Sequence, residues 1–129
     1  MSMLPPPPSP RGHVLIVDDD AGVRDVCTSL LHALGYRAEV ASSGSKAIET
    51  IAQDGTALQL VLLDLDMPGM SGEQVLRAVK ASQPWLRVLM MSGSPRADLR
   101  RCLEAGADAV LQKPFGLREL DDSMLRALS

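Results

Sequence analysis

The sequence has few aromatic residues, no excess of positive charge and no long apolar run. It contains one Tyr, one Trp and one Phe, so the core of the folded protein must be mainly aliphatic. The formal net charge of −3 argues against nucleic acid as a direct partner, because binding to phosphate backbones requires a basic face. No apolar stretch approaches the roughly 20 residues that cross a bilayer, and the start has no signal-peptide pattern. We therefore expect no direct binding to nucleic acid or membrane.

Cysteine is also scarce, and Cys27 and Cys102 are the only two. Both fall in segments with the apolar spacing of helices, and free cysteine is among the most buried residue types. Buried free thiols are therefore the favoured interpretation, although a disulfide between them is the alternative. Unpaired thiols are typical of a reducing compartment, and we expect a cytoplasmic protein.

The composition changes after the first dozen residues. Residues 1–12, "MSMLPPPPSPRG", are rich in proline and have no apolar period, which predicts an extended tail or linker. A proline-motif ligand for a partner domain is the alternative. Residues 13–129 are long enough to form one domain with its own core, without disulfides or a structural metal.

Strand and helix patterns alternate from residue 13 onward. Short runs rich in Val, Leu and Ile predict strands at 13–18, 36–41, 58–64, 86–92 and 108–113. Apolar residues at helical spacing predict helices at 21–35, 43–53, 71–82, 96–106 and 117–129. Such alternation indicates an α/β fold, in which helices cover both faces of a single five-stranded parallel sheet.

Polar residues stand at the carboxyl ends of four of these strands. The first strand ends in "DDD" (18–20), the third in Asp64, the fourth in Ser92 and the fifth in Lys113. Each alone has a structural explanation, such as a helix cap, a turn or a solvated loop. Together they favour a site, because the carboxyl ends of parallel strands meet at one edge of the sheet, where ligands bind.

The residue types at this edge indicate phosphoryl chemistry. Crowded carboxylates raise one another's pKa unless a cation neutralises them, and oxygen ligands suit Mg²⁺ or Mn²⁺ better than zinc. His13 and His32 stand apart, so no softer ligand cluster is expected. A carboxylate can act as the nucleophile that forms an aspartyl phosphate, and an ammonium and a hydroxyl can bind the oxygens of the transferred group.

The acidic cluster after "VLIV", together with "DLDMPGMSG", "MMSGS" and "KPF", resembles the receiver domain of bacterial two-component response regulators over residues 13–128. The proline-rich start and "MSGS" also resemble receivers of hybrid sensor histidine kinases. The resemblance implies a flavodoxin-like, doubly wound sheet with strand order 2-1-3-4-5. It further implies a signalling switch that assists its own phosphorylation and dephosphorylation, rather than an enzyme.

The resemblance also implies roles for the aspartates. Asp64 would accept a phosphoryl group from a phosphohistidine on a sensor histidine kinase or a histidine phosphotransfer protein. Asp19 would ligate Mg²⁺ directly and Asp18 partly through water. Asp64 itself and the backbone carbonyl of Asp66 would complete the protein's ligands. The side chain of Asp66 stands where the family tunes the lifetime of the phosphoryl group.

Ser92 matches the switch hydroxyl of the family. Lys113 matches the lysine that pairs first with the acceptor and then with the phosphoryl oxygens, and Pro114 stands where the family has a cis peptide bond. Val110 is a departure, because the family usually has Tyr or Phe at this position and couples its motion to the switch hydroxyl.

Phosphorylation in this family shifts the surface formed by the fourth helix, fifth strand and fifth helix, and a phosphorylation-linked dimer is a further expectation. The first helix, around Val23 and Arg24, would bind the phosphodonor. The arginines of the fourth and fifth helices are expected to be solvated charges paired with Glu104 rather than a partner face; they are Arg96, Arg100, Arg101 and Arg118.

Two rival functions use the same residues. "DLD" after an apolar strand also resembles phosphatases of the haloacid dehalogenase type, but their acidic metal pair follows that motif, whereas "DDD" here precedes it. A pseudo-receiver that only binds partners would require a broken acidic pocket. The sequence ends with the fifth predicted helix, so we expect either a stand-alone receiver or a receiver from a longer chain.

Overall fold

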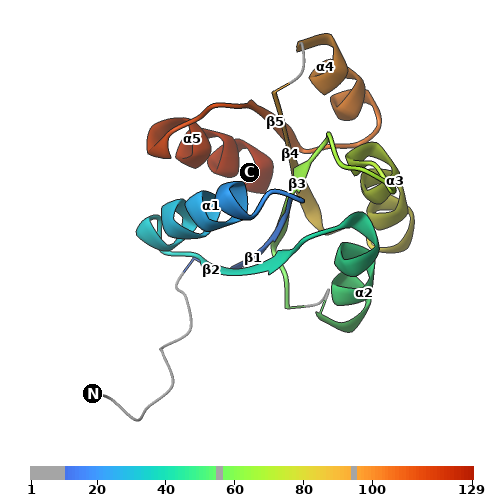
Figure 1. Ribbon diagram of the computed structural model, residues 1–129, viewed down its shortest axis with the longest axis horizontal. Coiled ribbons are helices and arrows are strands. Elements are labelled where there is room, and N and C mark those ends of the chain that lie inside the picture. The colour runs from blue at the N-terminus through green and yellow to red at the C-terminus, as the bar shows by residue number, and fades with distance from the viewer. Residues whose placement is uncertain (1–10, 55–56, 94–95) are drawn as a thin grey trace.

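The computed structural model describes residues 11–54, 57–93 and 96–129, in which five strands alternate with five helices (Figure 1). The strands are β1 (His13–Val17), β2 (Arg37–Ala41), β3 (Leu60–Asp64), β4 (Arg87–Ser92) and β5 (Ala109–Gln112). The helices are α1 (Ala21–Ala33), α2 (Gly44–Asp54), α3 (Gly72–Ser82), α4 (Arg96–Glu104) and α5 (Leu117–Leu128).

All ten predicted elements are confirmed, and their ends differ from the predicted ones by no more than two residues. Capping explains two of the differences. Ser71, predicted as the first residue of α3, is its N-cap and forms a capping box with Gln74. Leu34 is the C-cap of α1, which therefore ends at Ala33.

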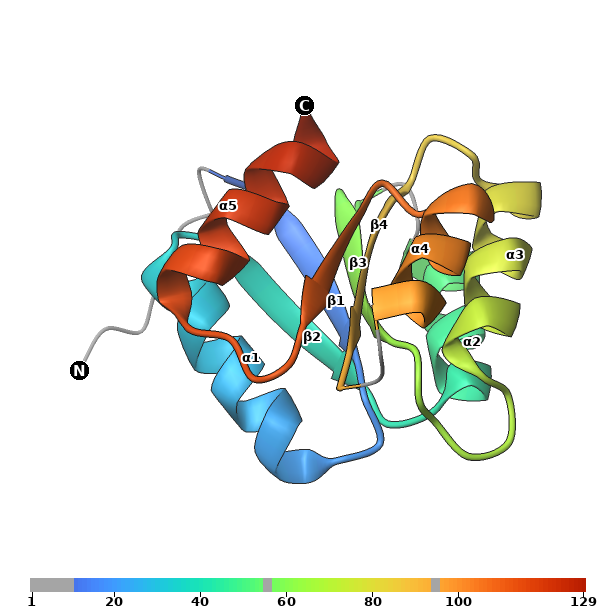
Figure 2. The same cartoon turned by 90° about the horizontal axis from the view of Figure 1, so that it is seen from above.

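The strands form one parallel sheet in the order β2-β1-β3-β4-β5, as predicted. Figure 2 shows α1 and α5 on one face of the sheet and α2, α3 and α4 on the other. β1 and β3 are neighbours within the sheet, and the topological switch point lies between them: β2 is added on one side of β1, and β3, β4 and β5 are added on the other. The fold class predicted from the sequence is therefore confirmed.

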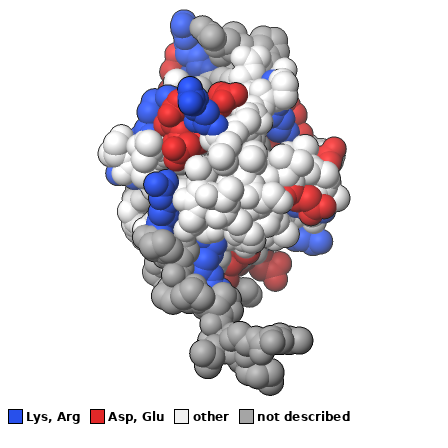
Figure 3. Space-filling model, turned by 90° about the vertical axis from the view of Figure 1, so that its left-hand side faces the viewer, with Lys and Arg blue, Asp and Glu red and all other residues white. Residues whose placement is uncertain are grey.

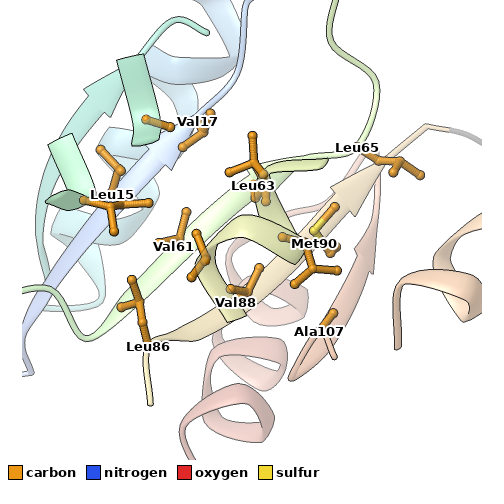
Figure 4. Close-up of a cluster of buried hydrophobic side chains, with 14 of the residues drawn as sticks. Leu15, Val17, Val61, Leu63, Leu65, Leu86, Val88, Met90 and Ala107 are labelled. Carbon is orange, nitrogen blue, oxygen red and sulfur yellow. The ribbon is translucent and has the colours of Figure 1, made fainter. Parts of the chain in front are cut away.

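Two aliphatic cores lie on either side of the sheet. The side chains of β3 alternate between them, so that Val61 and Leu63 pack toward α2, α3 and α4 (Figure 4), whereas Leu60 and Leu62 pack toward α1 and α5. Every residue of β3 is buried, which explains its almost uninterrupted apolar sequence. Cys27 and Cys102 are buried free thiols, as predicted.

The loop between β3 and α3 is held close to the end of the sheet. The backbone N–H of Gly72 donates to the carbonyl oxygen of Leu65 at 3.2 Å. A Cβ atom on Gly72 would overlap the backbone carbonyl oxygen of Asp64. Only glycine therefore lets α3 start this close to the strand that ends in Asp64.

The proline-rich segment predicted for residues 1–12 lies outside the described residues, except for Arg11 and Gly12. The guanidinium of Arg11 lies 5.9 Å from the centre of the Tyr36 ring and forms an ion pair with Asp121 of α5. Among the described residues, no helix is long and apolar enough to cross a membrane.

One predicted ion pair is wrong. Arg101 of α4 pairs with Glu73 at 3.0 Å and not with Glu104. Glu73 lies in the first turn of α3 and also pairs with Arg77. The spacing within α4 suggested a local partner, but the packing of α3 beside α4 offers a carboxylate from the neighbouring helix. The side chain of Arg96 lies outside the described part of the chain.

Replacing Gly72 with alanine should lower the free energy of unfolding by about 1–3 kcal/mol, because the added Cβ forces α3 away from β3. Urea unfolding would measure the change. Gly93→Ala is the matched control, since a Cβ at Gly93 meets no atom within 4 Å, and its effect should stay within about 0.5 kcal/mol. Equal effects of the two variants would contradict the close approach.

Candidate functional site

The polar residues predicted at the strand ends lie together at the carboxyl edge of the sheet. Asp18 follows β1, Asp64 ends β3 and Lys113 follows β5. The Nζ atom of Lys113 is 2.9 Å from Oδ2 of Asp18 and 3.2 Å from Oδ1 of Asp64. One ammonium group therefore bridges carboxylates from two strands.

Three carboxylates converge at this point. Oxygen atoms of Asp18, Asp19 and Asp64 all lie within 4.8 Å of one another. Asp18 and Asp64 are buried and Asp19 is exposed, so the cluster opens to solvent on the side of Asp19. It is the one group of potential metal ligands among the described residues.

The three aspartates of the "DDD" segment have different roles. Both oxygens of Asp18 are engaged, since Oδ1 accepts from the backbone N–H of Asp20 at 2.9 Å and Oδ2 accepts from Lys113. Asp20 is the N-cap of α1 and accepts from the backbone N–H of Val23 at 3.1 Å. Asp20 thus stabilises the start of α1, while Asp18 and Asp19 belong to the acidic cluster.

Arg24 supports this segment, a role that the sequence did not reveal. Its Nη1 atom donates to the backbone carbonyl of Asp18 at 2.8 Å. The backbone N–H of Asp18 donates to the carbonyl of Ala41 at 3.2 Å. Asp18 is therefore held by α1 and by the end of β2. The helical spacing of Arg24 gave no sign of this contact, which depends on how α1 packs.

Burial and a neighbouring negative charge disfavour the ionised form of Asp64. Its side chain is almost fully buried, and burial followed by repulsion from Asp18 raises its pKa to about 6. The ammonium of Lys113 and the backbone N–H of Asp66 oppose this rise. For Lys113, burial lowers the pKa, but the hydrogen bond and charge of Asp18 and the charge of Asp64 outweigh burial and raise it.

These groups fit a hard divalent cation. Three carboxylates face a single ammonium, so the cluster retains excess negative charge that a cation would neutralise. All of the donor atoms are carboxylate oxygens, which suit Mg²⁺ or Mn²⁺. The raised pKa of Asp64 has the same cause, because the negative charge of Asp18 disfavours a second ionised carboxylate beside it.

Ser92, the last residue of β4, is buried, and its hydroxyl donates to Oδ2 of Asp66 at 2.6 Å. Its backbone is fixed, because its carbonyl accepts from the N–H of Lys113 at 2.8 Å. Asp66 lies in the exposed loop after β3. The sequence did not reveal this side-chain contact, which arises because β3 and β4 are neighbours with Asp64 paired to Met91.

The two remaining predicted positions have distinct surroundings. The peptide bond between Lys113 and Pro114 is cis, which confirms that prediction. Val110 on β5 is half-buried and lines a groove of about 360 Å³ with Leu99 and Leu103 of α4. An aliphatic side chain therefore occupies the position where the resemblance to receiver domains predicts an aromatic ring.

A second groove, of about 430 Å³, opens beside the acidic cluster between α1 and the β5–α5 loop. Its apolar lining includes Val23, Val26 and Phe115, and the charged residues Asp20 and Lys113 also line it. Val26 is 56% exposed. Cys27 also lines the groove, but burial, followed by the charge of Asp18, raises the pKa of its thiol to about 11. Cys27 therefore remains a neutral thiol at neutral pH.

The pKa of Asp64 predicts how stability changes with pH in the metal-free protein. Because the folded value of about 6 exceeds the unfolded value of about 3.9, the folded state binds more protons between them. The contribution of Asp64 to the free energy of unfolding therefore falls as pH rises from about 4 to 6. Asp64→Asn should be more stable than the wild type at pH 7.5, on the order of 1–2 kcal/mol.

Urea unfolding in EDTA would test this at pH 4.5 and pH 7.5. The advantage of Asp64→Asn should shrink toward pH 4.5, where the wild-type carboxyl is mostly protonated in the folded protein. An advantage of the same size at both pH values would show that the charge of Asp64 is not its cause.

Comparisons with known proteins agree with this geometry. The family model described as response regulator receiver domain matches residues 14–125. The two-component response regulator ORR3 of Oryza sativa is 38% identical over 110 residues, which cover 83% of each chain. The transcriptional regulatory protein SphR of Synechococcus elongatus is 34% identical over 93% of this chain, which spans about half of that relative's length.

Solved structures give the same result. A CheY-like response regulator receiver domain protein from Methanospirillum hungatei superposes with a TM-score of 0.81 at 29% identity, over 91% of this chain and 93% of the other. The comparisons lend no support to the phosphatase alternative. The chain belongs to the response regulator receiver domains of two-component signal transduction systems.

Proposed function

We propose that this receiver acts as a switch by accepting a phosphoryl group on Asp64 from a phosphohistidine. The donor would be a sensor histidine kinase or a histidine phosphotransfer protein. The observation that carries the proposal is the position of Asp64, where a buried carboxylate lies between the ammonium of Lys113 and the carboxylates of Asp18 and Asp19. Asp18 has similar neighbours, but both of its oxygens accept hydrogen bonds, whereas Lys113 and the backbone N–H of Asp66 both donate to Oδ1 of Asp64.

The reaction needs an ionised carboxylate and a stabilised phosphoryl group. An oxygen of Asp64 attacks phosphorus, a P–O bond forms, and the P–N bond of the phosphohistidine breaks as the imidazole leaves. Lys113 already contacts Asp64, so its ammonium can favour the ionised nucleophile and then bind an oxygen of the transferred group.

We propose Mg²⁺, or Mn²⁺ in its place, as the cofactor. When bound, the ion would neutralise charge on the carboxylates and the phosphoryl oxygens. Asp19 is exposed and suits direct ligation, whereas both oxygens of Asp18 are already engaged, which suits a contact through water. Asp64 and the backbone carbonyl of Asp66 would supply the remaining protein ligands.

The response would pass through Ser92 to the surface of α4, β5 and α5. Phosphorylation replaces the single negative charge of the Asp64 carboxylate with a phosphoryl group of about −1.5 to −2 units of charge, whose oxygens would draw Ser92 and Lys113 toward them. Val110 offers no ring that could turn inward, so the change would involve the packing of α4 on β5 around the groove that contains Val110. A phosphorylation-linked dimer through this surface would fit the role of a switch that assists its own phosphorylation and dephosphorylation.

The apolar groove beside the site suits the phosphodonor. Val23, Val26 and Phe115 line the groove together with Lys113 and Asp20, so a helix that carries the phosphohistidine would find a mainly apolar surface at the entrance. On the face of the molecule shown in Figure 3, acidic and basic side chains border a broad uncharged area. That face offers no basic patch for nucleic acid.

The two buried free thiols support a reducing compartment, and we place this function in the cytoplasm.

Incubation with acetyl phosphate and Mg²⁺ should add one phosphoryl group to the wild-type chain, as measured by intact mass. Asp64→Asn should lack the adduct, because the nucleophile is gone, and EDTA should prevent it in the wild type. Asp66→Asn is the matched control for the neighbouring carboxylate and should still gain the adduct. An adduct on Asp64→Asn would disprove the assignment of the acceptor.

Val26→Asp should slow phosphoryl transfer from the phosphorylated donor protein at least tenfold, because a charge in the groove opposes apolar docking. Phosphorylation by acetyl phosphate should be unchanged, since a small donor does not need the groove. Leu125→Asp is the control, as Leu125 is a comparably exposed helical residue on α5. Equal slowing by both variants would contradict docking at α1.

A further inference from the structure

The hydroxyl of Ser92 already donates a hydrogen bond in the unphosphorylated protein. It donates to Oδ2 of Asp66 at 2.6 Å, a distance typical of a charge-assisted O–H···O⁻ hydrogen bond. An ionised carboxylate can only accept, so Ser92 is the donor in this pair.

A serine hydroxyl carries a single proton and makes one strong donated hydrogen bond at a time. A phosphoryl group on Asp64 is a second anionic acceptor at the end of the neighbouring strand. Ser92 cannot satisfy both Asp66 and the phosphoryl group. The two acceptors therefore compete for one proton, and the outcome decides which arrangement of the strand ends is stable.

We propose that Asp66 acts as a positioning residue, a latch that holds Ser92 in the resting arrangement and opposes the phosphorylated one. The inference rests on the proposed function of Asp64 and adds a route of control to it. Asp66 acts through the hydroxyl of Ser92, and its charge matters mainly because a carboxylate is a stronger acceptor than a neutral group.

Ser92 and Asp66 differ in their exposure to solvent, as a latch requires. Ser92 is fully buried, and its backbone carbonyl accepts a hydrogen bond from the N–H of Lys113, just beyond the end of β5. Asp66 lies on the exposed loop between the buried end of β3 and Gly72. Because the side chain of Asp66 is exposed, water can replace the hydroxyl of Ser92 as a donor when this contact breaks.

The affinity for beryllofluoride, a stable mimic of the phosphoryl group, measures this competition at equilibrium. Calorimetric titration at saturating Mg²⁺ gives Kd for the wild type, Asp66→Asn, Ser92→Ala and the double variant. A neutral acceptor holds the hydroxyl about half as strongly, so Asp66→Asn should bind beryllofluoride about five- to tenfold more tightly than the wild type. In the Ser92→Ala background the same substitution should change Kd by less than about twofold.

A matched control separates the latch from the loss of one negative charge. Asp20→Asn removes a carboxylate that lines the groove beside Lys113 and makes no hydrogen bond to Ser92, and Asn caps α1 as well as Asp does. It should change Kd by less than about twofold. Thermal melting of every variant would verify that each one is folded.

The outcomes separate the latch from the function on which it depends. Tightening by Asp66→Asn that Ser92→Ala abolishes would support the latch. Equal tightening in both backgrounds would overturn it, since Asp66 would then act by repulsion through space, as would an unchanged Kd in Asp66→Asn. A wild-type chain that binds no beryllofluoride with Mg²⁺ would overturn the proposed phosphoacceptor function itself.

Discussion

Two buried carboxylates that share one ammonium group are the constraint on which the rest of the structure depends. Asp18 and Asp64 lie at the ends of adjacent central strands, and Lys113 contacts both. Neither carboxylate would tolerate burial without a partner. One ammonium cannot balance the whole cluster, so the protein holds a site in which a cation or an incoming charged group changes the electrostatic balance.

The parallel sheet makes this arrangement possible. Strands that run in one direction bring all their carboxyl ends to one edge, although the residues there are far apart in the sequence. Lys113 follows β5, and β4 lies between β5 and the strand that carries Asp64, so a long side chain is required to reach the carboxylates. The packing of Gly72 against Asp64 then fixes the loop that places Asp66 beside Ser92.

The elements of the fold and most of the cluster could be predicted because local patterns carried the information, whereas the strand order came from the resemblance to receiver domains. Apolar periodicity placed every element, and Asp18, Asp64 and Lys113 were found from their positions at strand ends. Contacts between side chains of different elements could not be predicted in this way. Arg24 binds the carbonyl of Asp18, and Arg101 pairs with α3 rather than within α4. Both depend on how helices pack, which the spacing within one helix does not determine.

The sequence by itself determined the alternation of strands and helices, the direction of the strands and the acidic character of their ends, because these follow from periodicity and residue type. Only the tertiary structure decided that Asp20 caps α1, and that Asp66 accepts the hydroxyl of Ser92. Adjacent aspartates are chemically identical in the sequence. Their roles differ because strand pairing and loop packing place different donors within reach of each carboxylate.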